Sequence, residues 1–222
     1  MSEKQRWVIV VSFAAAMAWM ESATVLYLRT LVGRIDPFRA DPLPVSAGLG
    51  QTELIREAAT LLMLLSVGLL AGRTRRSRLA YALVAFGVCD LLYYVFLAGI
   101  AGWPKSLLDW DMLFLIPLPW CGPVLAPTTI AAMMILGGTL VSQFDEPERP
   151  VWPARRACVL SLIGVLLALY VFMTDAIGAL SGGAQAVRST LPTQFNWLLF
   201  GMALALMAAP VVDVSRYVRR SG

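Results

Sequence analysis

The sequence predicts an all-α fold: a polytopic transmembrane helix bundle of six spans, forming a single domain over residues 1–222. Three observations predict it. The chain has six apolar segments of at least 18 residues, only 14% of its residues are charged, and its basic residues alternate in number from loop to loop. A segment of this length crosses ~30 Å of hydrocarbon at ~1.5 Å per residue. So few charged groups would leave a soluble protein with too apolar a surface.

The basic residues predict the orientation of the bundle. With the N-terminus in the cytoplasm, the inner segments carry 12 Lys and Arg residues and the outer segments carry 5, while Arg56 lies inside a span. The positive-inside rule therefore places both termini in the cytoplasm, and we expect a multi-pass protein of the bacterial cytoplasmic (inner) membrane. The net charge of +4 is explained by these anchors, so no nucleic-acid partner is expected.

The first three spans are predicted at 7–31, 53–71 and 79–102. In the first, Ala14, Ala18 and Ser22 recur at intervals of four and form a stripe of small residues that lets another helix approach closely. Thr52 is a candidate N-cap of the second span. The connection between these two spans, residues 33–51, is rich in proline and glycine and is predicted to be irregular but compact.

The fourth apolar stretch is the unusual one, because proline interrupts its first half. Proline removes a helical hydrogen bond and pushes the residue before it away from helical angles. We therefore expect a proline-broken fourth span: a helix over 123–143, with Pro123 as its first residue, preceded by an outer apolar segment, 112–122, that is re-entrant or lies flat. The residues of this broken segment are Pro117, Pro119, Trp120, Pro123 and Pro127.

The last two spans are predicted at 157–178 and 195–212, the sixth ending near Pro210. No internal repeat is found. The proline-rich fourth span has no counterpart in the first span, which contains neither proline nor internal glycine. This mismatch counts against an inverted-repeat transporter, because such proteins favour matched interrupted helices.

Charged residues inside spans are costly and indicate function by default. Glu21, Arg56, Glu57 and Asp90 are the four that stand out. At ~1.5 Å per residue, Glu21, Asp90 and Glu57 lie ~18–24 Å above the inner ends of their spans, so all share one layer in the outer half of the membrane. Tyr93 and Tyr94 follow Asp90 by one turn and complete this intramembrane polar cluster. Their hydroxyl groups suit a carboxylate that holds a proton or a charge.

Just above this layer, further acids form a predicted outer mouth. It consists of Glu53, Asp109, Trp110, Asp111 and Asp175, with Arg29, Arg56 and Lys105 as the nearby bases. Two interpretations stay open. Arg56 either neutralises one carboxylate in a buried pair that fixes helix register, or one carboxylate is left without a base and binds a cation or exchanges a proton. Likewise, the broken segment either shapes the bundle or offers Trp110 and Trp120 as walls of a binding site.

The residues also exclude several chemistries. Histidine is absent, which argues against His-ligated haem and His-based zinc. No nucleotide-binding loop, nucleophile elbow, HExxH or CxxC motif is present, so no catalytic residue and no cofactor is assigned. A metal site would have to be built from carboxylates, and no ligand spacing supports one.

Three functions remain as hypotheses. The first, which asks least of the sequence, is a non-catalytic subunit or scaffold of a larger membrane assembly; its partners would be the lipid bilayer and other membrane chains, or copies of itself. The second is a transporter or channel for protons, cations or a small solute that uses Glu21, Glu57 and Asp90. The third is an intramembrane enzyme that acts on a lipid-like substrate, with a carboxylate as general acid and base.

Overall fold

The computed structural model describes residues 1–33, 47–115, 117–146, 148–188 and 194–221. Most of the predicted compact connection 33–51 therefore lies outside the described residues, as does Ile116 of the proline-rich segment. The elements, in chain order, are α1 (Glu3–Leu31), α2 (Ala47–Ala71), α3 (Arg75–Ala101), β1 (Trp110–Phe114), β2 (Trp120–Pro123), α4 (Leu125–Phe144), α5 (Arg155–Gly178), the 3-10 helix η1 (Leu180–Gly182), α6 (Gly183–Arg188), α7 (Trp197–Met207) and α8 (Ala209–Ser221).

Six helices in the described part of the chain are long and apolar enough to cross a membrane. Five are α1 to α5, and the sixth is formed by α7 together with α8. Large apolar side chains lie on the outside of the bundle; Leu70 and Leu198, for example, are 83% and 77% exposed. Such side chains belong in lipid rather than in water. The chain is therefore a multi-pass integral membrane protein.

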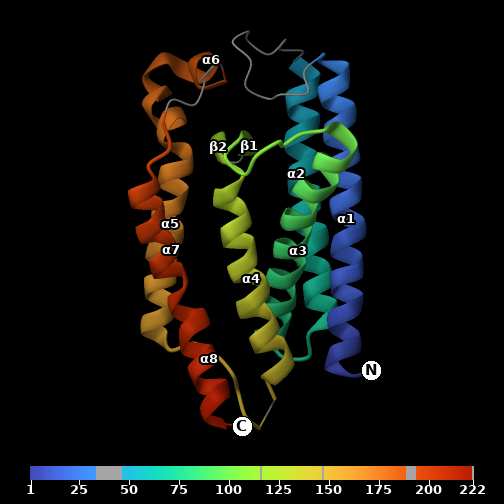
Figure 1. Cartoon of the computed structure of the whole chain (residues 1–222), viewed down its shortest axis with the longest axis vertical. Helices are drawn as coiled ribbons and strands as arrows, with labels where there is room; N and C mark the ends of the chain where they lie inside the picture. Colours follow the sequence, from blue (N-terminus) through green and yellow to red (C-terminus); the bar gives the residue numbers. More distant parts are fainter. Residues whose placement is uncertain (34–46, 116, 147, 189–193, 222) are drawn as a thin grey trace.

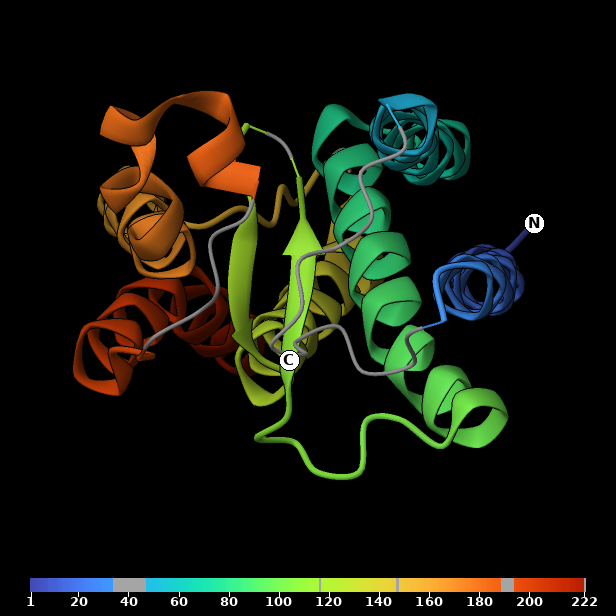
Figure 2. The ribbon, with the colours of Figure 1, turned by 90° about the horizontal axis from the view of Figure 1, so that it is seen from above.

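The spans run along the long axis of the molecule, with both termini at one end and the β-hairpin near the other (Figure 1). These are called the termini end and the hairpin end below. Helix α3 is central and packs against α1, α2 and α4 (Figure 2). Helices α5 and α7 pack on each other, and α5 contacts β2 and α8. That the termini end faces the cytoplasm stays a prediction from the charge bias.

Small residues bring the central helices together. Ala14, Ala18 and Ser22 are fully buried, and their stripe on α1 packs against α3. The Ser22 hydroxyl donates a hydrogen bond to the backbone carbonyl of Tyr93 at 2.9 Å. The predicted stripe is thus a helix contact within this chain.

Two glycines set the distance between α3 and α4. A Cβ atom on Gly87 would lie 2.7 Å from the carbonyl oxygen of Ala131, and one on Gly138 would lie 2.6 Å from that of Ala80. Real Cβ atoms essentially never approach so closely, because the contact is steric overlap. The backbones of α3 and α4 therefore pack directly on each other at these two positions.

The proline-rich segment forms a hairpin that the sequence did not predict. β1 and β2 pair antiparallel, with Trp110 opposite Pro123 and Met112 opposite Cys121. The expected helix start at Pro123 is wrong, because Pro123 ends β2 and α4 begins at Leu125. α4 then continues without interruption to Phe144, with Pro127 in its first turn, where a missing N–H breaks no helical hydrogen bond. Among the described residues of this segment, no helix is interrupted by proline.

The sixth span also differs from its prediction. α7 ends at Met207 and α8 runs from Ala209 to Ser221, so the helical segment continues nine residues beyond the predicted end at 212. Pro210 lies in the first turn of α8, which explains why the helix restarts there rather than running on from α7. The remaining boundaries differ by a few residues, as expected of helix ends.

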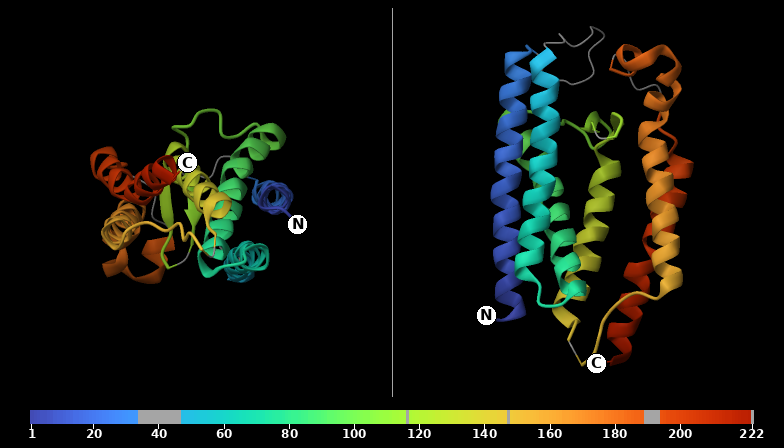
Figure 3. Two further views of the ribbon diagram at one scale, coloured as in Figure 1. Left: turned by 90° about the horizontal axis from the view of Figure 1, so that it is seen from below. Right: turned by 180° about the vertical axis from the view of Figure 1, so that it is seen from behind.

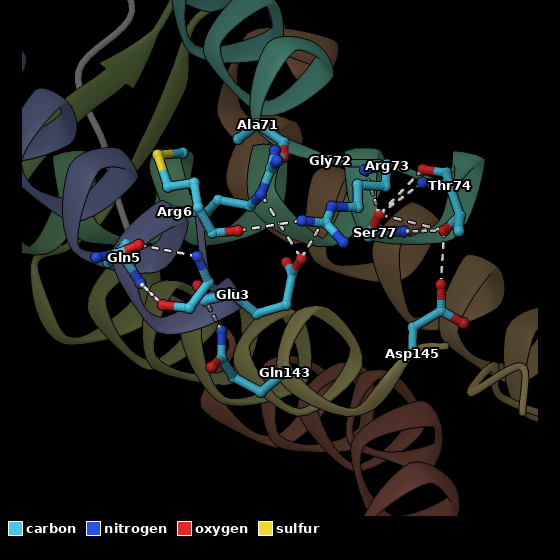
Figure 4. Close-up of polar contacts among 12 residues, drawn as sticks. Glu3, Gln5, Arg6, Ala71, Gly72, Arg73, Thr74, Ser77, Gln143 and Asp145 are labelled. Carbon is cyan, nitrogen blue, oxygen red and sulfur yellow. Dashed lines mark hydrogen bonds and ion pairs between the residues drawn. The ribbon is translucent and has the colours of Figure 1, made fainter. Parts of the chain in front are cut away.

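Polar contacts join the helices at the termini end (Figure 4). Glu3 of α1 forms ion pairs with Arg6 and with Arg73 of the α2–α3 turn, and the buried Tyr81 hydroxyl donates to it at 2.8 Å. The carboxylate of Asp145 accepts hydrogen bonds from Thr74, Arg76 and the backbone N–H of Val151. These contacts fasten α1, the α2–α3 turn and the end of α4 together.

Candidate functional site

At the hairpin end, α1 and α2 are joined by one arginine. Arg56 forms ion pairs with Glu21 of α1 and with Glu53, one turn earlier on α2. The Thr60 hydroxyl also donates a hydrogen bond to the Glu21 carboxylate, at 2.6 Å. The arginine thus pairs with one of the acids predicted inside the membrane and with one predicted at the outer mouth. One arginine on α2 therefore pairs with two carboxylates, one on α1 and one on α2, and the three groups together keep a net charge of −1 when all are ionised.

Glu57 is held by the backbone of the hairpin region. Its side chain is 8% exposed, and its Oε2 accepts a hydrogen bond from the N–H of Leu115 at 3.0 Å. No described lysine or arginine forms an ion pair with it. Glu57 therefore ties α2 to the end of β1, a backbone contact that the sequence pattern does not reveal.

Asp111 lies in β1 and is buried rather than placed at an open mouth. Its residue is 2% exposed, and its Oδ1 lies 2.9 Å from Nη2 of Arg29. The Tyr94 hydroxyl also donates a hydrogen bond to this carboxylate. The Arg29 guanidinium lies 4.0 Å from the ring centroid of Trp103, which adds a cation–π contact. Burial raises the pKa of Asp111 to about 6, and the charge of Arg29 opposes this shift.

Among the described residues, Asp90, like Glu57, has no base paired with it, and unlike Glu57 its side chain has no hydrogen bond either. It is partly buried, and no ion pair or hydrogen bond joins its side chain to any described residue. The charged group that acts on it is Asp111, another acid. Tyr93 and Tyr94, one turn further along α3, contact each other edge to face with ring centroids 4.9 Å apart.

These side chains form one group, which we call the hairpin-end cluster. It contains five carboxylates and two guanidinium groups: Glu21, Glu53, Glu57, Asp90 and Asp111, with Arg29 and Arg56. With every group ionised, its net charge is −3. An excess of acid in a low-dielectric region is costly unless protons or cations compensate it. The arrangement can therefore hold a positive charge that the chain itself does not supply.

Two further acids predicted at the outer mouth are Asp109 and Asp175, and the first of them has a structural role. The Asp109 carboxylate accepts hydrogen bonds from the N–H groups of Lys105 and Ser106, at 2.7 and 3.1 Å, and so closes the turn before β1. Burial, followed by the charges of Asp175 of α5 and of Asp111, raises the pKa of the Cys121 thiol in β2 to about 12. This thiol stays protonated at neutral pH.

The aromatic residues of the hairpin pack on other rings. Trp110 contacts Phe195, with centroids 6.1 Å apart, and Trp120 stacks on Phe172 at 6.2 Å with an interplanar angle of 8°. The indole Nε1 of Trp120 is buried and has no hydrogen-bond partner in the described chain. Pro117 and Pro119 lie between the two strands and are not helical. The two tryptophans therefore attach the hairpin to α5 and to the segment before α7.

Among the described residues, no three Asp, Glu or Cys side chains are grouped closely enough to hold a metal ion. The chain matches no protein-family model, no curated protein and no solved structure. A functional assignment must therefore come from the geometry of the hairpin-end cluster itself.

Sequence reasoning missed three parts of this cluster: the backbone contact of Leu115, the Thr60 hydroxyl, and Trp103 beneath Arg29. Thr60 carried a usable signal, because it lies one turn after Arg56 on the same helix face. The other two depend on how the segment between α3 and α4 folds back, and no local pattern encodes that.

Proposed function

We propose that this protein is a membrane carrier for a cation and that Asp90 is the group that binds it. The observation that carries the proposal is the charge balance of the hairpin-end cluster, in which five carboxylates face two guanidinium groups and Asp90 has no basic partner. A carboxylate at this depth is stable either protonated or beside a cation. Exchange between these two states is the elementary step of proton-coupled or cation transport.

Under this proposal, the three acids that the sequence predicted to act in transport have three different roles. Glu21 is paired with Arg56 and serves as an interhelical contact. Glu57 positions the end of β1 through the N–H of Leu115. Asp90 remains available for a ligand, and the neighbouring Asp111 adds negative potential. With the orientation predicted from the charge bias, the cluster lies in the non-cytoplasmic half of the membrane.

A subunit or scaffold role is the alternative, and the structure removes one of the reasons for it. The small-residue stripe on α1, which suited contact with another chain, is buried against α3 of the same chain. The residues of this stripe are fully buried and therefore expose no surface for contact with another chain. The transport proposal instead uses a feature that a scaffold does not require, namely an uncompensated carboxylate.

Flux through purified protein in liposomes tests the proposal. Two probes are used: protons, followed with an internal pH-sensitive dye, and radiolabelled tetramethylammonium. We expect wild-type protein to carry at least one of them, and Asp90→Asn to reduce that flux at least ten-fold. Glu148→Gln is the matched control, because it removes one acidic charge from an exposed position in the α4–α5 connection. Wild-type flux no greater than that of empty liposomes, or equal flux in Asp90→Asn, would refute the proposal.

A further inference from the structure

An apolar groove of about 170 Å³ lies on the bundle where α2, α3 and α4 meet. Seven side chains line it: Leu61, Leu64 and Leu65 of α2; Ala82, Leu83 and Phe86 of α3; and Met134 of α4. Leu61 and Leu65 are 37% and 44% exposed, so the groove is open to the side. In a membrane-spanning bundle this opening faces the hydrocarbon of the bilayer. The three helices follow one another across the molecule, with the hairpin above α4 (Figure 3).

Two acids of the hairpin-end cluster lie one helical turn beyond the lining of the groove. On α2, Glu57 lies one turn beyond Leu61, and on α3, Asp90 lies one turn beyond Phe86. Each step is four residues, a rise of about 6 Å. Phe86 stacks on Phe114 of β1 with centroids 6.1 Å apart, and the backbone N–H of the next residue, Leu115, donates a hydrogen bond to Glu57. The apolar lining therefore ends where the acidic groups begin.

A groove of this kind selects a ligand with two different ends. An apolar tail fits the leucine-lined part and reaches it from the bilayer without crossing water. The polar end then meets Glu57 and Asp90, which repel a phosphate or carboxylate and attract a cation. The rings of Phe86 and Phe114 lie at the junction and offer further contacts to a positive group.

We propose that the ligand of the carrier is an amphiphilic cation, with its alkyl tail in the α2–α3–α4 groove and its cationic head at Asp90. This inference rests on the proposed function and specifies its substrate class. It also implies lateral entry from the membrane. A small, fully hydrated cation has no use for the groove, whereas a cation with an alkyl chain occupies both regions.

The test compares two probes in protein reconstituted into lipid nanodiscs, with binding to empty nanodiscs subtracted. One probe is dodecyltrimethylammonium and the other is tetramethylammonium, which has the same head without the tail. Leu65→Trp fills the groove, and Leu62→Trp is its matched control, because Leu62 faces lipid on the same helix but does not line the groove.

We expect Leu65→Trp to weaken dodecyltrimethylammonium binding about ten-fold and to leave tetramethylammonium binding unchanged, which also shows that the variant is folded. Leu62→Trp should change neither. Equal effects of the two tryptophan variants, or equal affinity of the two probes for wild-type protein, would overturn the amphiphile proposal while leaving the cation site intact. Asp90→Asn should weaken both probes; if it weakens neither, the proposed function itself fails.

Discussion

Replacing Arg56 by glutamine removes the base that Glu21 and Glu53 share. Both carboxylates are then left in a region where their charge is costly, and α1 loses its ionic contact with α2. Breaking a buried ion pair by removing one partner costs about 3–5 kcal/mol, whereas an exposed pair contributes about 0–1 kcal/mol. The side chains of Arg56, Glu21 and Glu53 are 22%, 14% and 21% exposed, so the lower end of the buried range applies.

We therefore expect Arg56→Gln to lower the free energy of unfolding by about 3 kcal/mol, a change of about 150-fold in the folded-to-unfolded ratio. Glu53→Gln should cost about 1 kcal/mol, because Arg56 keeps its pair with Glu21. The double variant Arg56→Gln, Glu21→Gln should be more stable than the sum of the single variants predicts, by about 1–3 kcal/mol, because no unpaired charge remains between the two helices.

The assay is reversible unfolding in mixed micelles, followed by circular dichroism as the denaturing detergent is increased. Five proteins are measured at pH 7 in the same lipid and salt: wild type, Arg56→Gln, Glu53→Gln, Glu21→Gln and the double variant. A loss of less than about 1 kcal/mol for Arg56→Gln, the range of an exposed pair, would show that the cluster is solvated and that the reasoning from burial is wrong. Strict additivity in the double variant would show that the two residues do not interact.

Gly138, Asp111 and Asp145 each hold a different part of the bundle, and a substitution at each has a measurable effect. Gly138→Leu forces a side chain into the carbonyl of Ala80 and should cost about 1–3 kcal/mol or more in the same unfolding assay, whereas Gly99→Leu, whose Cβ would meet nothing within 4 Å, should be close to neutral. Because burial raises the pKa of Asp111 from 3.8 to about 6, its folded state binds a proton more tightly than its unfolded state. Stability should fall by about 2 kcal/mol as pH rises from about 4 to about 6, and Asp111→Asn should remove this decrease when unfolding is measured at both pH values. Asp145→Ala removes the fully buried carboxylate that accepts hydrogen bonds from Thr74, Arg76 and Val151, and these donors are then left without a partner. The variant should lower the midpoint of thermal unfolding by an amount equivalent to about 2 kcal/mol.

The spans were predictable because length and hydropathy act locally: any helix of that length and composition is unstable in water. The depth of a residue within its span can also be predicted from the sequence, because a helix rises by a constant amount per residue. This is why Glu21 and Arg56, which are ion-paired, could be placed in one layer from the sequence. Which of the candidate acids would face Arg56 was not predictable, because that depends on the rotation of α1 and α2 about their axes.

The hairpin and its contacts could not be predicted from the sequence, for a different reason. The strands β1 and β2 have five and four residues, and apolar runs this short have no periodicity that separates strand from helix. Asp111 was therefore placed at an outer mouth, whereas the strand carries it inward to Arg29. The lack of a base for Asp90 follows from the same folding, since Arg29 is paired with Asp111 instead.

The way α5 joins the rest of the bundle has a consequence for how the protein is made. The first four spans contact one another extensively through α3, and they emerge from the ribosome before α5 is complete. They can thus assemble in the bilayer as a unit, onto which the last two spans later dock. Expression of the chain as two polypeptides, divided between the exposed residues Glu148 and Arg149, should accordingly yield fragments that co-purify.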